Sequence, residues 1–334
     1  MRPHSAARRG LVALGAVVVL GGTVWLVRAA VSSPGRTSGT TGSVGRAGTS
    51  PTGTAPARAA PTTTTTPGPA PARRGLAVTR TGLQLVDTGR ALVRGGVVLA
   101  PDRPLPTDVW TPDAPGRYPL VVFVHGYDRS PLQYERFCST LASSGYVVAA
   151  PSFPLEDPTR GFGLDRSDLV NEAADVASVI TSMQAAAVTN RIEPSTVAVV
   201  GHSDGADVAL EVGYEEGTAD HRVGALVAIA PDPITTSLAP STAPLLLVQG
   251  TADSVVPYSA SQRVFAQLPG PTWYVTLLGA DHLPPVDGGT PWTPVLDSAV
   301  AAFLDATVAR RGPGAAALAG QLGSSPLVRL ATKG

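Results

Sequence analysis

The chain has 334 residues, of which 43% are apolar and 15% are charged, and its formal net charge at pH 7 is +0. This composition supplies a sizeable core and argues against a partner recognised by charge, such as nucleic acid. The single cysteine, Cys138, excludes an internal disulfide, and we expect its thiol to be buried and inert.

Residues 1–31 are predicted to be an export signal or a membrane anchor. Arg8 and Arg9 precede a run made almost entirely of apolar residues and glycine, residues 11–27, which Arg28 ends. Positive charge on the amino-terminal side favours export of the remainder of the chain. The run is long for a cleaved signal and barely long enough to span a bilayer, so both outcomes stay open. Either way, we expect the rest of the chain outside the cytoplasm, secreted or membrane-anchored.

Residues 32–74 are predicted to be a disordered linker. They are rich in Thr, Pro, Gly, Ser and Ala and contain almost no large apolar side chains. Such a segment cannot bury enough surface to offset the entropy lost on ordering. It would hold the following domain away from a membrane.

From residue 75 to residue 311 the sequence predicts one globular domain in which apolar strands alternate with amphipathic helices. The predicted strands span residues 83–86, 91–99, 120–124, 146–150, 197–200, 224–230, 245–248 and 272–278. The predicted helices lie near residues 134–142, 168–187, 206–212, 260–268 and 293–309. Residues 312–334 are rich in Gly, Ala, Ser and Pro, and we expect a flexible tail there.

This alternation predicts an α/β fold with one mostly parallel central sheet and helices on both of its faces. Only the loops 151–166 and 231–244 are candidates for covering the edge of the sheet at which the parallel strands have their carboxyl ends. Little or no cap is therefore expected.

The residues Gly201, His202, Ser203, Asp204 and Gly205 form a G-x-S-x-G motif between a predicted strand and a predicted helix. In this context the motif is typical of a nucleophile elbow, whose sharp turn pushes the serine hydroxyl above the edge of the sheet. The two glycines permit the close backbone approach that such a turn needs. We therefore expect Ser203 to be a nucleophile.

A serine nucleophile needs a base and an acid that orients the base. Asp253 follows the strand 245–248, and His282 follows the strand 272–278, which gives the chain order Ser, Asp, His. Asp232, after the strand 224–230, is an alternative acid, although its position is less usual. Asp281 is adjacent to His282 and is interpreted as a surface residue.

The oxyanion formed during acyl transfer needs preorganised donors. We expect the backbone N–H of Asp204 to be one and that of Tyr127, in the loop His125-Gly126-Tyr127, to be the other. His125 and His202 are expected to point away from Ser203 and to bond structural loops.

Six segments resemble, in order, the dienelactone-hydrolase-like branch of the α/β-hydrolases, which includes cutinase-like polyester hydrolases and platelet-activating-factor acetylhydrolases. These segments are residues 105–134, 141–154, 172–180, 201–210, 245–257 and 279–282. The resemblance implies the α/β-hydrolase fold, the Ser203, Asp253 and His282 triad, and a serine esterase mechanism without metal or organic cofactor.

Three departures limit what the resemblance implies. Dienelactone hydrolases use cysteine where this chain has Ser203, and polyester hydrolases often carry a disulfide that one cysteine cannot form. Asp204 replaces the Met, Ala or Gly that is more usual beside the serine, which leaves the substrate preference open.

The sequence thus predicts a monomeric serine hydrolase that cleaves small-molecule, lipid or polymeric carboxylic esters through an acyl-enzyme. A catalytically silent cell-surface binding protein on the same fold is an alternative. An acyltransferase or a peptidase with the same triad is another.

Overall fold

The computed structural model describes residues 75–185, 190–232, 243–268, 270–311, 315–322 and 325–334. The predicted export segment and linker, residues 1–74, lie outside this part of the chain. Within the described residues, no helix combines the length and the apolar character needed to cross a membrane.

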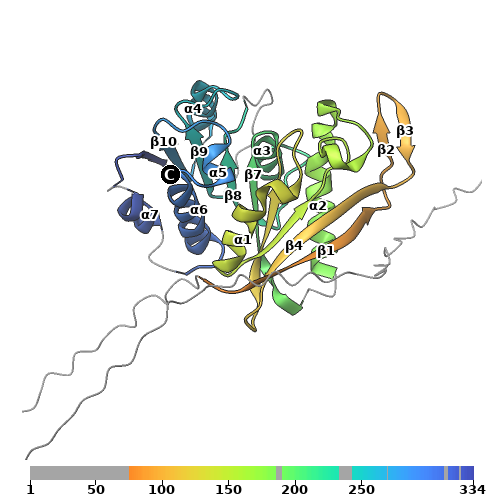
Figure 1. Cartoon of the computed structure of the whole chain (residues 1–334), viewed down its shortest axis with the longest axis horizontal. Coiled ribbons are helices and arrows are strands. Elements are labelled where there is room, and N and C mark those ends of the chain that lie inside the picture. The colour runs from red at the N-terminus through yellow and green to blue at the C-terminus, as the bar shows by residue number, and fades with distance from the viewer. Residues whose placement is uncertain (1–74, 186–189, 233–242, 269, 312–314, 323–324) are drawn as a thin grey trace, which may run out of the picture. The chain divides into compact units, whose positions relative to one another are not determined.

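A nine-stranded sheet organises the described residues (Figure 1). In spatial order its strands are β1 (Val78–Asp87), β4 (Arg103–Pro112), β6 (Val147–Pro151), β5 (Tyr118–Val124), β7 (Ile192–His202), β8 (Val223–Ile229), β9 (Leu245–Gly250), β10 (Thr272–Leu277) and β11 (Val328–Lys333). Neighbouring strands from β6 to β10 run parallel, whereas β1, β4 and β11 pair antiparallel with their neighbours. The mostly parallel α/β sheet predicted from the sequence is confirmed.

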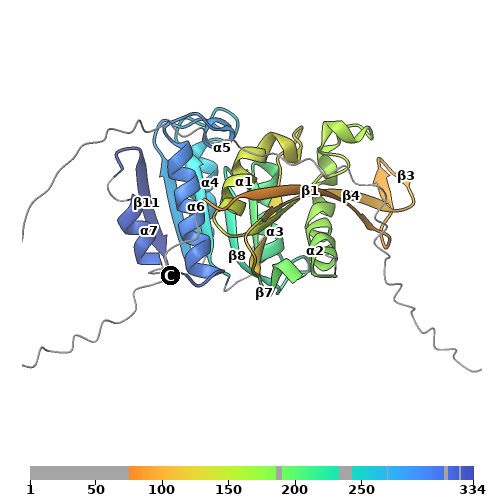
Figure 2. The ribbon, with the colours of Figure 1, turned by 60° about the horizontal axis from the view of Figure 1, so that its bottom comes forward.

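Helices cover both faces of this sheet (Figure 2). One face packs against α2 (Leu169–Ala185), α3 (Asp204–Tyr214) and α4 (Tyr258–Gln267), and the other against α1 (Glu135–Ser143), α6 (Thr293–Thr307) and α7 (Ala315–Leu322). The two cores follow from the alternation of side chains along a strand. In β5, Leu120 and Val122 belong to the core on the α3 side, and Val121 and Phe123 to the core on the α6 side. The all-apolar strand is thus buried on both faces.

The prediction of a flexible tail over residues 312–334 is wrong for the parts of that segment that the structure describes, residues 315–322 and 325–334. Helix α7 buries Leu318 and Leu322 in the core on the α6 side, and β11 pairs with β10 from Thr272 opposite Lys333 to Leu277 opposite Val328. The segment orders because β10 would otherwise expose unpaired N–H and C=O groups at the edge of the sheet.

The segment 91–99 is also not one strand. It forms a separate hairpin of β2 (Leu92–Arg94) and β3 (Val97–Ala100). Gly95 and Gly96 turn the chain at φ 55° and 80°, which glycine adopts without steric cost. The long strand β4 was not predicted, because polar residues and prolines interrupt its apolar pattern.

Candidate active site

Ser203 lies at the sharp turn between β7 and α3, with φ 57° and ψ −128°. A positive φ is strained for a residue with a Cβ, and such strain clusters at functional sites. A Cβ on Gly201 would lie 1.8 Å from the carbonyl oxygen of Gly205, and a Cβ on Gly205 would lie 2.3 Å from that of Val124. Only glycine therefore fits at either side of this turn, which leaves Ser203 half-buried at the carboxyl end of β7.

Asp253 and His282, which follow β9 and β10, are in direct contact. His282 Nδ1 lies 2.9 Å from Asp253 Oδ2, and the two side chains are 7% and 1% exposed respectively. The backbone N–H groups of Val255 and Val256 donate to Asp253 Oδ1 at 2.9 and 2.8 Å. Burial opposes the ionisation of Asp253, but the hydrogen bonds from His282 and these N–H groups outweigh it and lower its pKa. An ionised Asp253 requires the proton on Nδ1, so Nε2 is the basic nitrogen of His282.

The His282 ring lies against the elbow. Its centroid is 4.7 Å from that of His202, the residue that precedes Ser203. Among the described residues no hydrogen bond joins the Ser203 hydroxyl to the His282 ring. In uncomplexed active sites such contacts are often long and close only around substrate. In the structure, Asp253 therefore contacts His282, and the His282 ring lies against the elbow that carries Ser203. The hydrogen bond between the Ser203 hydroxyl and the His282 ring is not formed.

A buried chain of hydrogen bonds connects three loops of the site through Tyr134. The Gly126 N–H donates to the Tyr134 hydroxyl at 3.4 Å, that hydroxyl lies 2.9 Å from His202 Nδ1, and His202 Nε2 lies 3.2 Å from the carbonyl oxygen of His282. A carbonyl oxygen only accepts, so Nε2 of His202 carries the proton and Nδ1 accepts from Tyr134. Burial lowers the pKa of His202 to about 3, which keeps this ring neutral.

The backbone N–H groups of Tyr127 and Asp204 have no acceptor among the described residues. Asp204 is the first residue of α3, where backbone N–H groups lack an intrahelical partner. The loop that holds Tyr127 packs closely on the elbow, since a Cβ on Gly126 would lie 3.0 Å from that of Ser203. Two backbone donors without an acceptor in the described residues thus belong to the elbow and to the loop that packs against it. The Tyr127 side chain is 36% exposed.

Arg166 binds the carboxylate beside the serine, a contact that the sequence did not predict. Its Nε and Nη2 lie 2.6 and 2.7 Å from the two oxygens of Asp204, and Nη2 lies 3.2 Å from Asp232. Arg166 begins η3 (Arg166–Asp168), at the end of the loop that follows β6. Asp232, the alternative acid of the sequence analysis, therefore contacts Arg166 and not His282.

Three further carboxyl groups, those of Asp207, Glu156 and Glu172, are buried. Burial raises the pKa of Asp207 to about 9, and repulsion from Asp204 and Asp232 adds to the effect. Burial likewise raises the pKa of Glu156 and that of Glu172. All four carboxyl oxygens of these two glutamates lack a hydrogen-bond partner in the described part of the chain. These groups are therefore favoured in their protonated forms.

Asp281 has a structural role that its interpretation as a surface residue missed. Its Oδ1 accepts from the N–H groups of Ser254 and His282, both at 2.8 Å, and from the Ser254 hydroxyl at 2.9 Å. It thereby joins the loop that carries Asp253 to the loop that carries His282. The feature of the sequence that could have indicated this role is the position of Asp281 directly before His282.

Within the described part of the chain, no group of three or more His, Cys, Asp or Glu side chains is arranged so that it could hold a metal ion. Cys138 is a buried free thiol on α1, as predicted, and burial raises its pKa well above the usual range.

Comparisons with known proteins point to esterases. The chlorophyllase family model matches residues 91–254, a range that contains Ser203 and Asp253 and ends before His282. The chain is similar to chlorophyllase-1, chloroplastic, of Citrus sinensis, with 29% identity over 149 residues, 42% of each chain. It is also similar to chlorophyllase type 0 of Chenopodium album, with 29% identity over 141 residues, 38% of each chain. The chain thus spans less than half the length of these curated relatives.

Among solved structures, a ferulic acid esterase from Streptomyces cinnamoneus superposes with a TM-score of 0.60 at 21% identity. The superposition covers 78% of this chain and 98% of the esterase. The superposition therefore covers a larger share of the chain than residues 91–254, which the family model matches. The chain has the α/β-hydrolase fold, as the motifs in its sequence predicted.

Proposed function

We propose that the protein is a carboxylic ester hydrolase in which Ser203 is the nucleophile, His282 the base and Asp253 the acid that orients His282. The observation that carries this proposal is the buried contact of 2.9 Å between Asp253 and His282, beside a serine held at φ 57°. An isolated buried His–Asp pair has many structural explanations, but its position against a strained elbow serine has few.

The proposed reaction proceeds through an acyl-enzyme. Ser203 Oγ attacks the ester carbonyl while Nε2 of His282 takes the hydroxyl proton, and the same nitrogen returns it to the leaving alcohol. Water then repeats the sequence on the acyl-enzyme and releases the acid. The N–H groups of Tyr127 and Asp204 would hold the negative oxygen of both tetrahedral intermediates.

The comparisons support an ester hydrolase, because the superposed structure is a ferulic acid esterase and the matched family is that of chlorophyllase. They leave the substrate open. The Arg166 and Asp204 pair beside the serine differs from the small or apolar neighbour that the resemblance implies, so the substrate preference of this chain must be measured.

The test is labelling with a fluorophosphonate probe together with hydrolysis of p-nitrophenyl butyrate. The full chain should react with the probe and hydrolyse the ester, and Ser203→Ala should do neither. Ser144→Ala, which removes a hydroxyl that caps α1 away from the site, is the control and should behave like the unmodified chain. Absence of labelling in a folded protein would favour the silent binding protein. Faster transfer to an added alcohol or cleavage of a peptide would favour an acyltransferase or a peptidase.

We further propose that the protein acts outside the cytoplasm as a monomer, attached to a membrane or released. The location outside the cytoplasm rests on the arginines and the apolar run within residues 1–31. In a bacterial host, the chain made with these residues should be found in the membrane fraction or the medium. Recovery in the cytoplasm, or a dimer in size-exclusion chromatography, would contradict it.

A further inference from the structure

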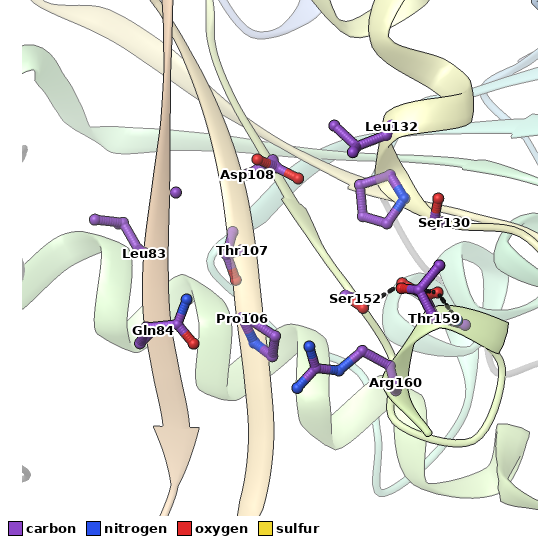
Figure 3. A pocket seen from close by; sticks show the side chains of 13 residues that line it. Leu83, Gln84, Pro106, Thr107, Asp108, Ser130, Leu132, Ser152, Thr159 and Arg160 are labelled. Atoms are coloured by element: carbon purple, nitrogen blue, oxygen red, sulfur yellow. Dashed lines mark hydrogen bonds between the residues drawn. The ribbon is translucent and has the colours of Figure 1, made fainter. Parts of the chain in front are cut away.

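A cavity of about 300 Å³ lies beside β1 and β4, separate from the proposed catalytic residues (Figure 3). The start of η1 (Pro131–Tyr134) and the loop that contains η2 (Pro158–Arg160) form its other walls. Its volume is at the lower end of the range for small-molecule sites, about 300–1,000 Å³.

The cavity contains an unsatisfied cation. The guanidinium of Arg160 has no ion-pair or hydrogen-bond partner among the described residues, and its Nε is buried. Figure 3 shows this side chain extending across the cavity toward Pro106. A buried donor without an acceptor is costly, so an acceptor supplied by a ligand would stabilise it.

The same cavity also contains two carboxyl groups that can accept hydrogen bonds from a ligand. Asp157 is fixed by the Ser152 hydroxyl and by the Thr159 N–H, the latter at 2.8 Å. Asp108 has only a loose ion pair, 3.9 Å from Arg80, and burial raises its pKa. The cavity therefore offers one cation, two carboxyl groups and hydroxyl groups to a ligand.

This combination disfavours ligands that carry charge of only one sign. A phosphate or carboxylate would meet Asp108 and Asp157, and an ammonium group would meet Arg160. Neutral hydroxyl groups can donate to the carboxylates and accept from the guanidinium at the same time. The apolar side chains of Leu83 and Pro131 supply surface for the C–H groups of such a ligand.

We propose that this cavity binds a neutral polyhydroxylated group, as in a short saccharide, and serves as a subsite for the hydroxylated part of the ester. The two loops that line it also serve the catalytic site. One leaves β5 and contains Gly126 and Ser130, and the other leaves β6, where the Phe153 N–H lies 3.2 Å from His125 Nε2. From β7 to β4 the sheet has three strand spacings, about 14 Å. An extended substrate could thus occupy both places, a role that rests on the proposed function.

Binding is tested without catalysis, by calorimetric titration of the full-chain Ser203→Ala variant with xylotriose or maltotriose. Saturable binding at millimolar concentrations is expected, and adding Arg160→Ala should weaken it about tenfold. Arg263→Ala, which removes an exposed arginine on α4, is the matched control and should leave binding unchanged. No saturable binding, binding unaffected by Arg160→Ala, or tighter binding of inorganic phosphate than of either saccharide would overturn the proposal.

The subsite role is tested separately by hydrolysis of a xylotriose monoester and of ethyl butyrate. Arg160→Ala should lower kcat/KM for the saccharide ester about tenfold and leave ethyl butyrate unchanged. Equal loss on both esters would contradict a subsite. If Ser203 proves unreactive while Arg160-dependent saccharide binding persists, the esterase proposal fails and the binding site stands.

Discussion

Two carboxylates in the sequence could orient His282, and their contacts in the structure differ. Asp253 lies 2.9 Å from His282 Nδ1, whereas Asp232 contacts Arg166. Asp253→Asn should lower kcat for p-nitrophenyl butyrate by about 10³–10⁴, because an amide stabilises the wrong tautomer and not the imidazolium. Asp232→Asn, its matched control, should change kcat by less than about tenfold. A larger loss in Asp232→Asn than in Asp253→Asn would reverse the assignment.

Tyr134 is predicted to be a positioning residue, since its hydroxyl joins the Gly126 loop to His202. Tyr134→Phe keeps the ring and removes that link, so kcat should fall about tenfold with little change in KM. Tyr146→Phe is the control, because the Tyr146 hydroxyl donates to Asp305 at 2.6 Å in the core on the α6 side. It should lower the thermal midpoint without changing kcat. Equal effects of both variants on kcat would show that Tyr134 has only a structural role.

At this scale the sequence indicated some residues of the candidate site and did not indicate others. Ser203, Asp253 and His282 could be named because each follows a strand, and the carboxyl ends of parallel strands share one edge of the sheet. Tyr134 and Arg166 could not be named in this way. Their contacts depend on the paths of two irregular loops, which leave no periodic pattern in the sequence.

At the scale of elements, the Arg166 and Asp204 pair fastens the loop after β6 to the first turn of α3. Arg166→Gln would leave the Asp204 carboxylate, 5% exposed, without its cation beside a proposed oxyanion donor. Both the free energy of unfolding and kcat/KM should therefore fall. The loss should be moderate, because Arg166 itself is 51% exposed.

A double-mutant cycle checks this coupling through urea unfolding and ester hydrolysis. Asp204→Asn added to Arg166→Gln removes the unpaired charge and should restore part of both quantities. Simple addition of the two single effects would show that the ion pair does not connect the loop to the elbow.

The same scale explains why the carboxyl-terminal segment was misjudged. Its Gly, Ala, Ser and Pro content indicates a flexible chain, yet Leu318 and Leu322 on α7 are buried and β11 completes the sheet. Composition indicates whether a segment would be ordered in isolation. In the fold, this segment is ordered because β11 pairs with the edge strand β10. By contrast, β5, β6 and β8 were predicted closely, because strands buried on both faces require continuous apolar runs.

At the scale of the whole molecule, the formal net charge is +0, but some of the acidic side chains lie in the interior. Asp207, Glu156 and Glu172 are buried, and burial raises the pKa of each. Over the pH range in which the unfolded chain has lost these protons, the folded chain still binds them. At these three groups the unfolded state therefore binds fewer protons, so their contribution to the stability of the fold decreases as the pH rises.

Asp207 provides the sharpest test of this prediction, since its folded pKa is about 9 against an ordinary value of 3.8. Its contribution to stability is fully present below about pH 4 and is lost as the pH rises toward about 9. Asp207→Asn keeps an oxygen that can accept the Asp232 N–H, which donates to Asp207 at 2.9 Å, but it cannot ionise. Its thermal midpoint should therefore fall less than that of the unmodified chain between about pH 5 and pH 9.

Asp128→Asn, at an exposed position with φ 56° that asparagine tolerates, is the control and should follow the unmodified chain. If Asp207→Asn shows the same decrease as the control, Asp207 is ionised in the fold, and the decrease must come from other groups.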